Sequence, residues 1–200
     1  MKVLLTAFEP FGGESINPAL EAIQLIPDKI GEKEIVRAII PTAFESSIAT
    51  VIAYIEKEQP DVVLSIGQAG GRSDITVERV AININDARIP DNEEKQPVDQ
   101  PIVEDGPAAY FSNLPIKAMV QAIREVEIPA SVSNTAGTFV CNHLMYGVLH
   151  YLKSHYPQAR GGFIHVPFLP KQVAQRANTA PSMSLENIVK GIEAAIAVIQ

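Results

Sequence analysis

Short runs of apolar residues recur along the chain, each bounded by glycine, proline or polar residues. Runs of this length are typical of strands buried on both faces of a sheet, because such strands have no polar side to expose. Two of the runs pass directly into "EPFGG" and "GQAGG", which are typical of turns. We therefore predict buried strands within residues 2–8, 34–42, 61–67, 130–137 and 161–170.

Between these runs, apolar residues recur at intervals of three and four, the spacing of one helix face. Ile48, Val51 and Ile55 form one such series, which ends before a proline. Asn17 followed by Pro18 is typical of an N-cap with proline at the first helical position. Helices are therefore predicted within residues 18–26, 44–60, 114–129, 141–155 and 185–200.

The segment between residues 74 and 105 follows neither pattern. Its first part, "ITVERVAININDARIPDN", alternates and is rich in β-branched residues, which favours strands or a hairpin. Its second part, "DNEEKQPVDQPIVEDG", is polar and contains proline, which favours a loop. Because strands and helices alternate on either side of this insertion, we predict an α/β fold: a three-layer sandwich around a mostly parallel twisted sheet, forming one domain over residues 1–200.

Composition narrows the class of partner. The 200 residues carry a net charge of −7 and no cluster of Lys or Arg, which argues against binding nucleic acid. The apolar run at the N-terminus is too short for a signal peptide, and no segment is long and apolar enough to span a membrane. One cysteine excludes an intrachain disulfide and a multi-cysteine metal site, so we expect a cytoplasmic protein without metal or cofactor.

Four segments that carry unusual residues follow predicted strands, at the carboxyl edge of the sheet, where sites in parallel sheets form. They are "FEPFGG", "GQAGG", "TAGTFVC" and the end of "GGFIH". Neither glycine-rich segment has the Gly-Lys-Ser/Thr ending of a Walker loop, and no dinucleotide fingerprint is present. A nucleotide site is therefore not expected.

Cys141 lies where a predicted turn gives way to a helix. The partial positive charge of a helix N-terminus lowers a thiol pKa toward neutrality, which would favour a nucleophilic thiolate. A lone cysteine among apolar residues is also commonly a small core residue, so position alone leaves both interpretations open.

A nucleophilic cysteine needs a base and an orienting carboxylate. His143 is too close to Cys141 in a helix to serve, whereas His165 lies in an apolar strand where its ring needs a partner. The candidate carboxylates are Glu78, flanked by apolar residues, and Asp86 and Asp91, for which turn and capping roles are the default.

These segments together resemble the pyroglutamyl-peptidase I family, also called pyrrolidone-carboxylate peptidases, which are cysteine peptidases. The resemblance covers almost the whole chain and implies removal of an N-terminal pyroglutamyl residue from peptides. It also implies an α/β/α sandwich, commonly a homotetramer, and a triad of Cys141, His165 and Glu78. It rests on "FEPFGGESINP", "GQAGGRSDITVERVAININDARIPDN", "GPAAYFSNLPIKAM", "SNTAGTFVCNHLMYG" and "GGFIHVPFLP".

With that activity, we expect a thiolate–imidazolium pair between Cys141 and His165. We expect an oxyanion bound by the Cys141 N–H and, by resemblance, by Arg88. Pyroglutamate is a small uncharged lactam, so its pocket is expected to be apolar with a few hydrogen-bonding groups. The candidates for that pocket are Phe8, Phe11, Asn17, Gln68, Phe139 and Val140.

For the pocket, the phenylalanines are more often core residues, and Asn17 already has a role as a helix cap. Three other functions compete with the peptidase interpretation. The first is a cysteine amidohydrolase for another acyl group, and the second is a non-enzymatic α/β ligand-binding domain with an inert buried cysteine. The third is nucleoside or phosphate binding through "GQAGGRS" at a helix start, which no accompanying lysine or acidic partner supports.

Overall fold

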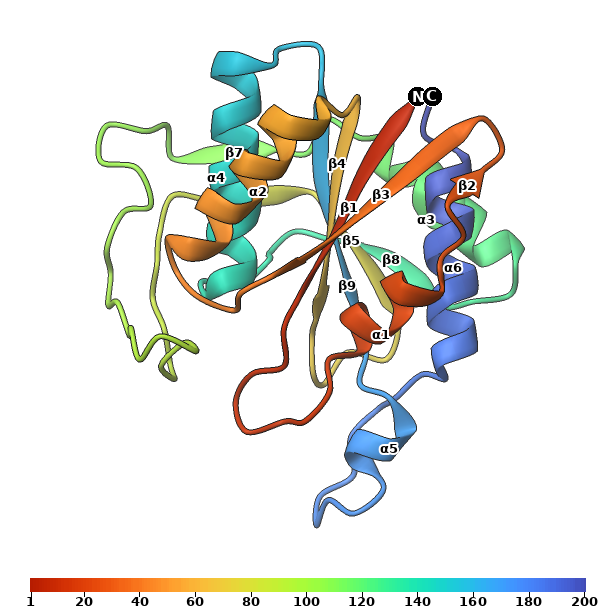
Figure 1. Ribbon diagram of the computed structural model, residues 1–200. Helices are drawn as coiled ribbons and strands as arrows, with labels where there is room; N and C mark the ends of the chain where they lie inside the picture. Colours follow the sequence, from red (N-terminus) through yellow and green to blue (C-terminus); the bar gives the residue numbers. More distant parts are fainter.

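A computed structural model describes residues 1–200 and contains one seven-stranded sheet with helices on both faces (Figure 1). The strand order is β2-β3-β1-β4-β9-β5-β8, and a separate pair is formed by β6 and β7. The strands are β1 (Lys2–Phe8), β2 (Lys29–Ile30), β3 (Lys33–Ile40), β4 (Val62–Gln68), β5 (Ile75–Glu78), β6 (Val80–Ile82), β7 (Ala109–Phe111), β8 (Ala130–Ser133) and β9 (Arg160–Val166).

The sheet is mostly parallel, with two antiparallel pairs. β1 pairs in parallel with β3 and β4, β4 with β9, and β5 with β8. β2 runs antiparallel to β3 at one edge, and β5 runs antiparallel to β9 inside the sheet. The predicted α/β sandwich is therefore confirmed, and the reversal between β9 and β5 was not predicted.

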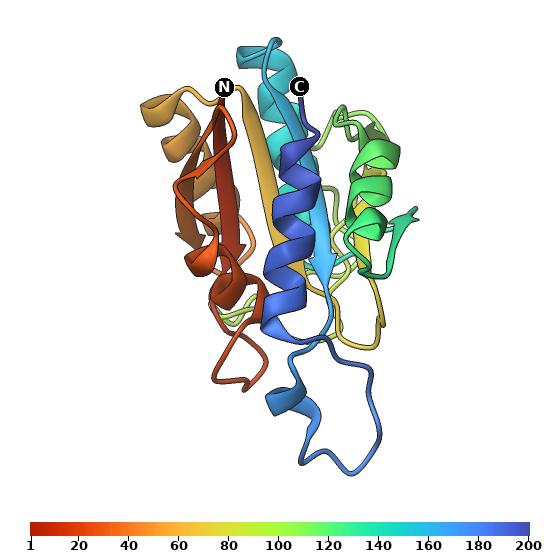
Figure 2. The same ribbon diagram turned by 90° about the vertical axis from the view of Figure 1, so that its right-hand side faces the viewer.

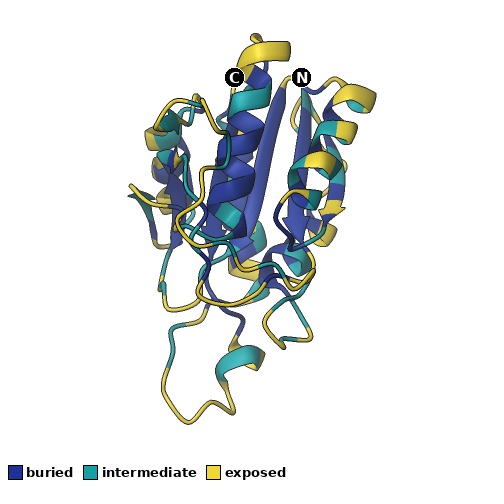
Figure 3. Ribbon diagram, turned by 90° about the vertical axis from the view of Figure 1, so that its left-hand side faces the viewer, coloured by how far each residue is buried: buried dark blue, intermediate teal, exposed yellow.

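The helices cover both faces of the sheet (Figures 1 and 2). α1, α3 and α6 pack on one face, and α2 and α4 pack on the other, where their inner sides are buried (Figure 3). Because both faces are covered, strands such as β4 are buried along their length, as their continuous apolar sequence predicts. The helices are α1 (Pro18–Leu25), α2 (Ser46–Glu58), α3 (Ile116–Glu125), α4 (Val140–His155), α5 (Pro170–Val173) and α6 (Leu185–Ala197).

The predicted start of the first helix is confirmed. Asn17 is the N-cap of α1, and its side-chain oxygen accepts a hydrogen bond from the backbone N–H of Ala19 at 3.0 Å. Pro18 follows at the first helical position, where its missing N–H costs nothing. None of the helices combines the length and apolar character needed to cross a membrane.

The insertion differs from its predicted form in one respect. β5 and β6 are strands, but β6 does not form a hairpin with β5; it pairs antiparallel with β7, a strand that was not predicted. The polar segment between them is a loop, as expected. This loop and the connections after β1, β4 and β9 lie near the carboxyl edge of the parallel strands (Figure 1).

Candidate active site

Thr76, Glu78 and His165 lie on the same face of the sheet. β5 and β9 are antiparallel, and Thr76 lies opposite His165 in their register. Because side chains two residues apart on a strand share a face, Glu78 is a diagonal neighbour of His165, within reach of a long side chain. The alternate residues of β5, Ile75 and Val77, face the other way, into the core beneath α3 and α6.

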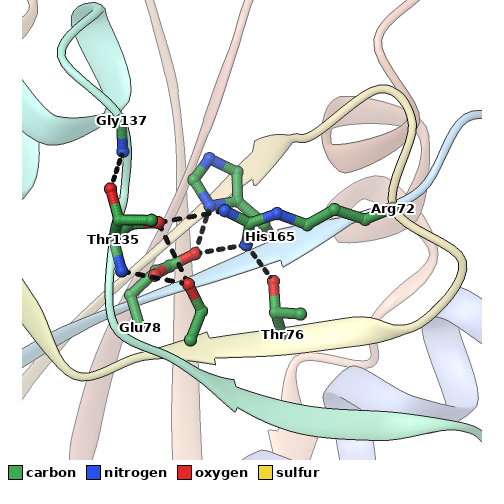
Figure 4. Close-up of polar contacts among 7 residues, drawn as sticks. Arg72, Thr76, Glu78, Thr135, Gly137 and His165 are labelled. Carbon is green, nitrogen blue, oxygen red and sulfur yellow. Dashed lines mark hydrogen bonds and ion pairs between the residues drawn. The ribbon is translucent and has the colours of Figure 1, made fainter.

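Glu78 and His165 form a buried hydrogen-bonded pair (Figure 4). The Nδ1 atom of His165 lies 2.7 Å from Oε1 of Glu78, and the two residues are 3% and 0% exposed. An ionised carboxylate can only accept a hydrogen bond, so the ring proton lies on Nδ1. The Nε2 atom of His165 is then an unprotonated acceptor.

Cys141 lies in the first turn of α4 and is half-buried. Its sulfur occupies space above β4 that a side chain at Gly67 would fill. A Cβ built on Gly67 would lie 3.0 Å from Sγ of Cys141 and 2.8 Å from the ring of Phe163. Gly67 is paired with His165 in the β4–β9 register, so the sulfur lies above the immediate neighbour of that histidine.

The N-terminus of α4 has free backbone donors. Its N-cap, Phe139, provides no side-chain hydrogen bond. The N–H of His143 bonds to the Phe139 carbonyl oxygen at 3.1 Å, and the N–H groups before it have no partner within the helix. The N–H of Cys141 is therefore available to an anion at the helix terminus.

Burial controls the protonation of the three residues. It raises the pKa of the Cys141 thiol to about 12, with a further rise from the charge of Glu78 and a partial offset from Arg72. Burial also lowers the pKa of His165, against the opposing effect of Glu78. For Glu78 burial raises the pKa, but the hydrogen bonds and charges of its neighbours outweigh it and lower the pKa.

Burial of the sulfur raises the thiol pKa and so opposes the depression expected from the helix N-terminus. Burial thus favours the neutral forms of Cys141 and His165 before substrate binds, and the thiolate–imidazolium pair stays a prediction.

The other two candidate carboxylates do not contact His165. Asp91 organises the insertion: its Oδ2 accepts from the N–H of Phe44 at 2.7 Å, and its Oδ1 accepts from two N–H groups of the following turn. Asp86 lines the cleft beside Cys141, and its backbone bonds to Thr138. Glu78 is thus the carboxylate that the fold brings to the histidine.

The remaining histidines have other contacts. His143 is buried, with its Nδ1 at 2.9 Å from Asn85 Oδ1 and its Nε2 at 3.0 Å from the N–H of Glu45. His150 bonds to a tyrosine hydroxyl, and His155 is exposed and stacks on a tyrosine ring.

Cys141 and His165 line one cleft of about 650 Å³ at the carboxyl edge of the sheet. Four of the predicted binding residues also line it. The rings of Phe11 and Phe139 lie with their centroids 6.1 Å apart. The other two residues, Gln68 and Arg88, add polar groups to the wall.

Three predicted pocket residues do not line the cleft. Phe8 is 2% exposed, and its ring packs against Phe163 in the core. Val140 is fully buried in the same core. Asn17 is 1% exposed, and its amide is used by the α1 cap and by a 3.3 Å bond to the Glu9 carbonyl oxygen. These residues support the walls from behind.

The sequence pattern of one protein family, described as pyroglutamyl peptidase, matches residues 1–200. The chain belongs to the pyroglutamyl peptidase family. The pyrrolidone-carboxylate peptidase of Alkaliphilus oremlandii is 60% identical over 98% of this chain and 92% of its own length. The pyrrolidone-carboxylate peptidase of Treponema denticola is 59% identical with the same coverage.

Solved structures of pyroglutamyl peptidase family members have the same fold. The crystal structure of pyroglutamyl peptidase I from Bacillus amyloliquefaciens is 50% identical, with a TM-score of 0.95 over 99% of this chain and 96% of that one. A mutant pyrrolidone carboxyl peptidase from the hyperthermophile Pyrococcus furiosus is 43% identical, with a TM-score of 0.94 over 100% and 98% of the two chains.

Two features of the site were missed at the level of sequence. The first is Arg72, which bonds to Glu78 at 2.6 Å. A signal for it existed, because a carboxylate between apolar residues requires a compensating cation and "GGRSD" lies only six residues earlier. The second is the segment that begins with α5: Gln172 donates to Gln68 Oε1 at 2.9 Å, and Arg176, which lines the cleft, pairs with Glu14.

Proposed function

We propose that this protein removes an N-terminal pyroglutamyl residue from peptides, with Cys141 as the nucleophile, His165 as general base and acid, and Glu78 as the orienting carboxylate. The observation that carries the proposal is the buried His165–Glu78 pair on the wall of the cleft that also holds the only cysteine. Membership of the pyroglutamyl peptidase family favours this activity over a ligand-binding domain with an inert cysteine.

In the first step, Nε2 of His165 accepts the thiol proton as Sγ of Cys141 attacks the pyroglutamyl carbonyl carbon. Burial favours the neutral thiol and the neutral imidazole from which this transfer starts. The imidazolium that forms keeps its Nδ1–H bond to ionised Glu78, which stabilises the new positive charge. The thiolate, which is the nucleophilic species, forms as this proton moves from Sγ to Nε2.

The tetrahedral intermediate carries a negative oxygen that needs donors already in place. The N–H of Cys141 is one donor, since it has no partner within α4. The guanidinium of Arg88, on the wall of the same cleft, is the second candidate. Collapse of the intermediate breaks the C–N bond, and Nε2–H of His165 protonates the leaving amine. Water activated by His165 then hydrolyses the thioester and releases pyroglutamate.

For the acyl pocket, Phe11 and Phe139 provide an apolar surface for the flat lactam ring, and Gln68 provides an amide for its polar edge. Phe8 and Val140 pack behind this surface, and Asn17 fixes the loop that carries Phe11 through its bond to Glu9. These three residues support the pocket without lining it.

We also propose that the 200 residues act as one peptidase domain in the cytoplasm, where a single thiol stays reduced. A homotetramer is the proposed assembly. Side chains such as Phe111 and Val98, which are 68% and 63% exposed, are apolar surface that an assembly would cover.

The test is the release of aminomethylcoumarin from its pyroglutamyl amide, with the prolyl and alanyl amides as controls. We expect cleavage of the pyroglutamyl amide alone. Because Cys141 is the only thiol, iodoacetamide should abolish this cleavage, and mass spectrometry should show one added group. Hydrolysis of the prolyl amide instead would favour another acyl specificity, and no hydrolysis by folded, reduced protein would refute the peptidase assignment.

A further inference from the structure

The guanidinium of Arg72 contacts the Glu78 carboxylate and two groups beside it (Figure 4). Its Nη1 donates to Oε1 of Glu78 at 2.6 Å and also contacts the hydroxyl of Thr76. Its Nη2 donates to the carbonyl oxygen of Thr135 at 3.0 Å, in the turn that follows β8. The Arg72 side chain is 27% exposed and lines the cleft, while its guanidinium is bonded to residues of β5.

Arg72 and His165 donate to the same oxygen of Glu78. Oε1 accepts both bonds, whereas Oε2 is buried without any hydrogen-bond partner. The orientation of the carboxylate therefore depends on two donors at one atom. Without Arg72, the bond to His165 alone would have to fix the rotation of both the carboxylate and the imidazole ring.

Arg72 also balances charge in the site. Glu78 and Arg72 together are neutral, so transfer of a proton from Cys141 to His165 leaves the net charge of the four residues at zero. The charge of Glu78 raises the pKa of the Cys141 thiol, and the charge of Arg72 lowers it. Without Arg72, a thiolate would form near an uncompensated carboxylate in a desolvated site.

We propose that Arg72 is the fourth functional member of the site, a positioning residue that fixes the Glu78 carboxylate against His165 and compensates its charge so that the thiolate can form. This inference rests on the proposed peptidase function. Arg72 acts through Glu78, and its loss should change both the rate and the pH dependence of the reaction.

The pH dependence involves a small set of groups. Glu78 bonds to His165, the charge of Arg72 affects the His165 pKa, and Cys141 lines the same cleft. Asp86, Arg88 and Arg176 line the same cleft farther along its walls. Arg72 lowers the pKa of His165, so its removal should raise that pKa and move the acid limb of kcat/KM to higher pH.

The experiment compares wild type with Arg72→Gln and Arg72→Lys over pH 5–9. We expect Arg72→Gln to lower kcat/KM roughly 10- to 100-fold, as for misplacement of a catalytic group. Its acid limb should shift to higher pH. Arg72→Lys keeps the charge but loses the planar fork, so its acid limb should stay near that of wild type while kcat is partly reduced.

The matched control is Arg79→Gln, which removes the same charge from the residue next to Glu78, whose side chain bonds to Asn134 and not to the Glu78 carboxylate or His165. The second readout is the rate of iodoacetamide alkylation of Cys141 against pH, which needs no substrate. We expect slower alkylation in Arg72→Gln and no change in Arg79→Gln. Circular dichroism identifies any variant that fails to fold. If Arg72→Gln fails to fold, the comparison of Arg72→Lys with wild type becomes the test.

A fall in kcat with unchanged pH and alkylation profiles would reduce Arg72 to a structural residue and overturn the proposal. Wild-type activity in folded Arg72→Gln would overturn it too. If wild type cleaves no pyroglutamyl amide, the peptidase assignment fails, but the alkylation profiles still decide whether Arg72 assists the thiol.

Discussion

His165 and His143 are both buried, and each has its Nδ1 within hydrogen-bond distance of a side-chain oxygen on another element. The distances are 2.7 Å to Glu78 for His165 and 2.9 Å to Asn85 for His143. Burial lowers the pKa of both imidazoles. The two sites differ at the second nitrogen and in the charge of the partner.

At His143, both nitrogens are occupied. Nε2 accepts the N–H of Glu45, which has a φ of +62°, a value that non-glycine residues seldom adopt. The ring thus ties the first turn of α4 to the start of α2, and Asn85 offers no negative charge to an imidazolium. At His165, the partner is ionised Glu78, and Nε2 is left free to accept a proton. Burial alone does not distinguish the two histidines; the free second nitrogen and the charged partner of His165 do.

The largest effect should come from replacing His165, and the same replacement of His143 provides the comparison. His165→Gln should lower kcat/KM by a factor on the order of 10⁴ or more, because the thiol loses its base. Cys141→Ala should be equally inactive, with the fold intact. His143→Gln should stay within about tenfold of wild type, since its contacts are structural. Steady-state kinetics on the pyroglutamyl amide measures all three, and equal losses in folded His165 and His143 variants would erase the distinction.

The charge of the partner is tested by Glu78→Gln. A neutral amide does not stabilise the imidazolium, and its NH₂ group can donate to Nδ1 and move the ring proton to Nε2. We expect a loss of kcat/KM roughly two orders of magnitude smaller than that of His165→Gln, as for the orienting member of other triads. A Glu78→Gln enzyme with wild-type kcat would show that the carboxylate is dispensable.

The smallest effect is on stability. Burial lowers the pKa of His143 from 6.5 to about 4. Between these values the unfolded chain binds a proton that the folded chain does not, so stability is lost as the pH falls from 6.5 toward 4. The shift corresponds to about 3 kcal/mol at most.

Urea unfolding at pH 7 and pH 4.5 measures this contribution. The fall in unfolding free energy should be about 2 to 3 kcal/mol smaller in His143→Gln than in wild type. Arg79→Gln serves as a control because its site contains no buried histidine. Identical pH slopes in wild type and His143→Gln would mean that His143 is protonated in the folded state.

The fold was predictable where local pattern and burial agree. The apolar run of β4 and the cap at Asn17 needed no tertiary information, and the alternation of elements was enough for the sandwich. β7 was not predictable because its three residues form a strand only by pairing with β6. The two-residue β2 and the four-residue α5 are similarly too short to leave a periodic signal.

The site was predictable in its residue types but not in its electrostatics. An isolated histidine and an isolated glutamate in apolar strands each needed a partner, and the antiparallel register of β5 and β9 makes them partners of one another. The raised pKa of Cys141 and the burial of Phe8 depend on how closely other elements cover them, and no local sequence encodes that. The contact of Arg72 with the turn that carries Thr135 also depends on tertiary structure.

The lack of a side chain at Gly67 of β4 has a consequence for other chains with this fold. Any side chain there would collide with the Phe163 ring and press on the Cys141 sulfur. In another chain with this fold, a larger residue at that position would therefore require the sulfur and the aromatic ring to move, even where the cysteine itself is retained. The space that β4 leaves empty thus fixes where a cysteine sulfur can lie at this edge of the sheet.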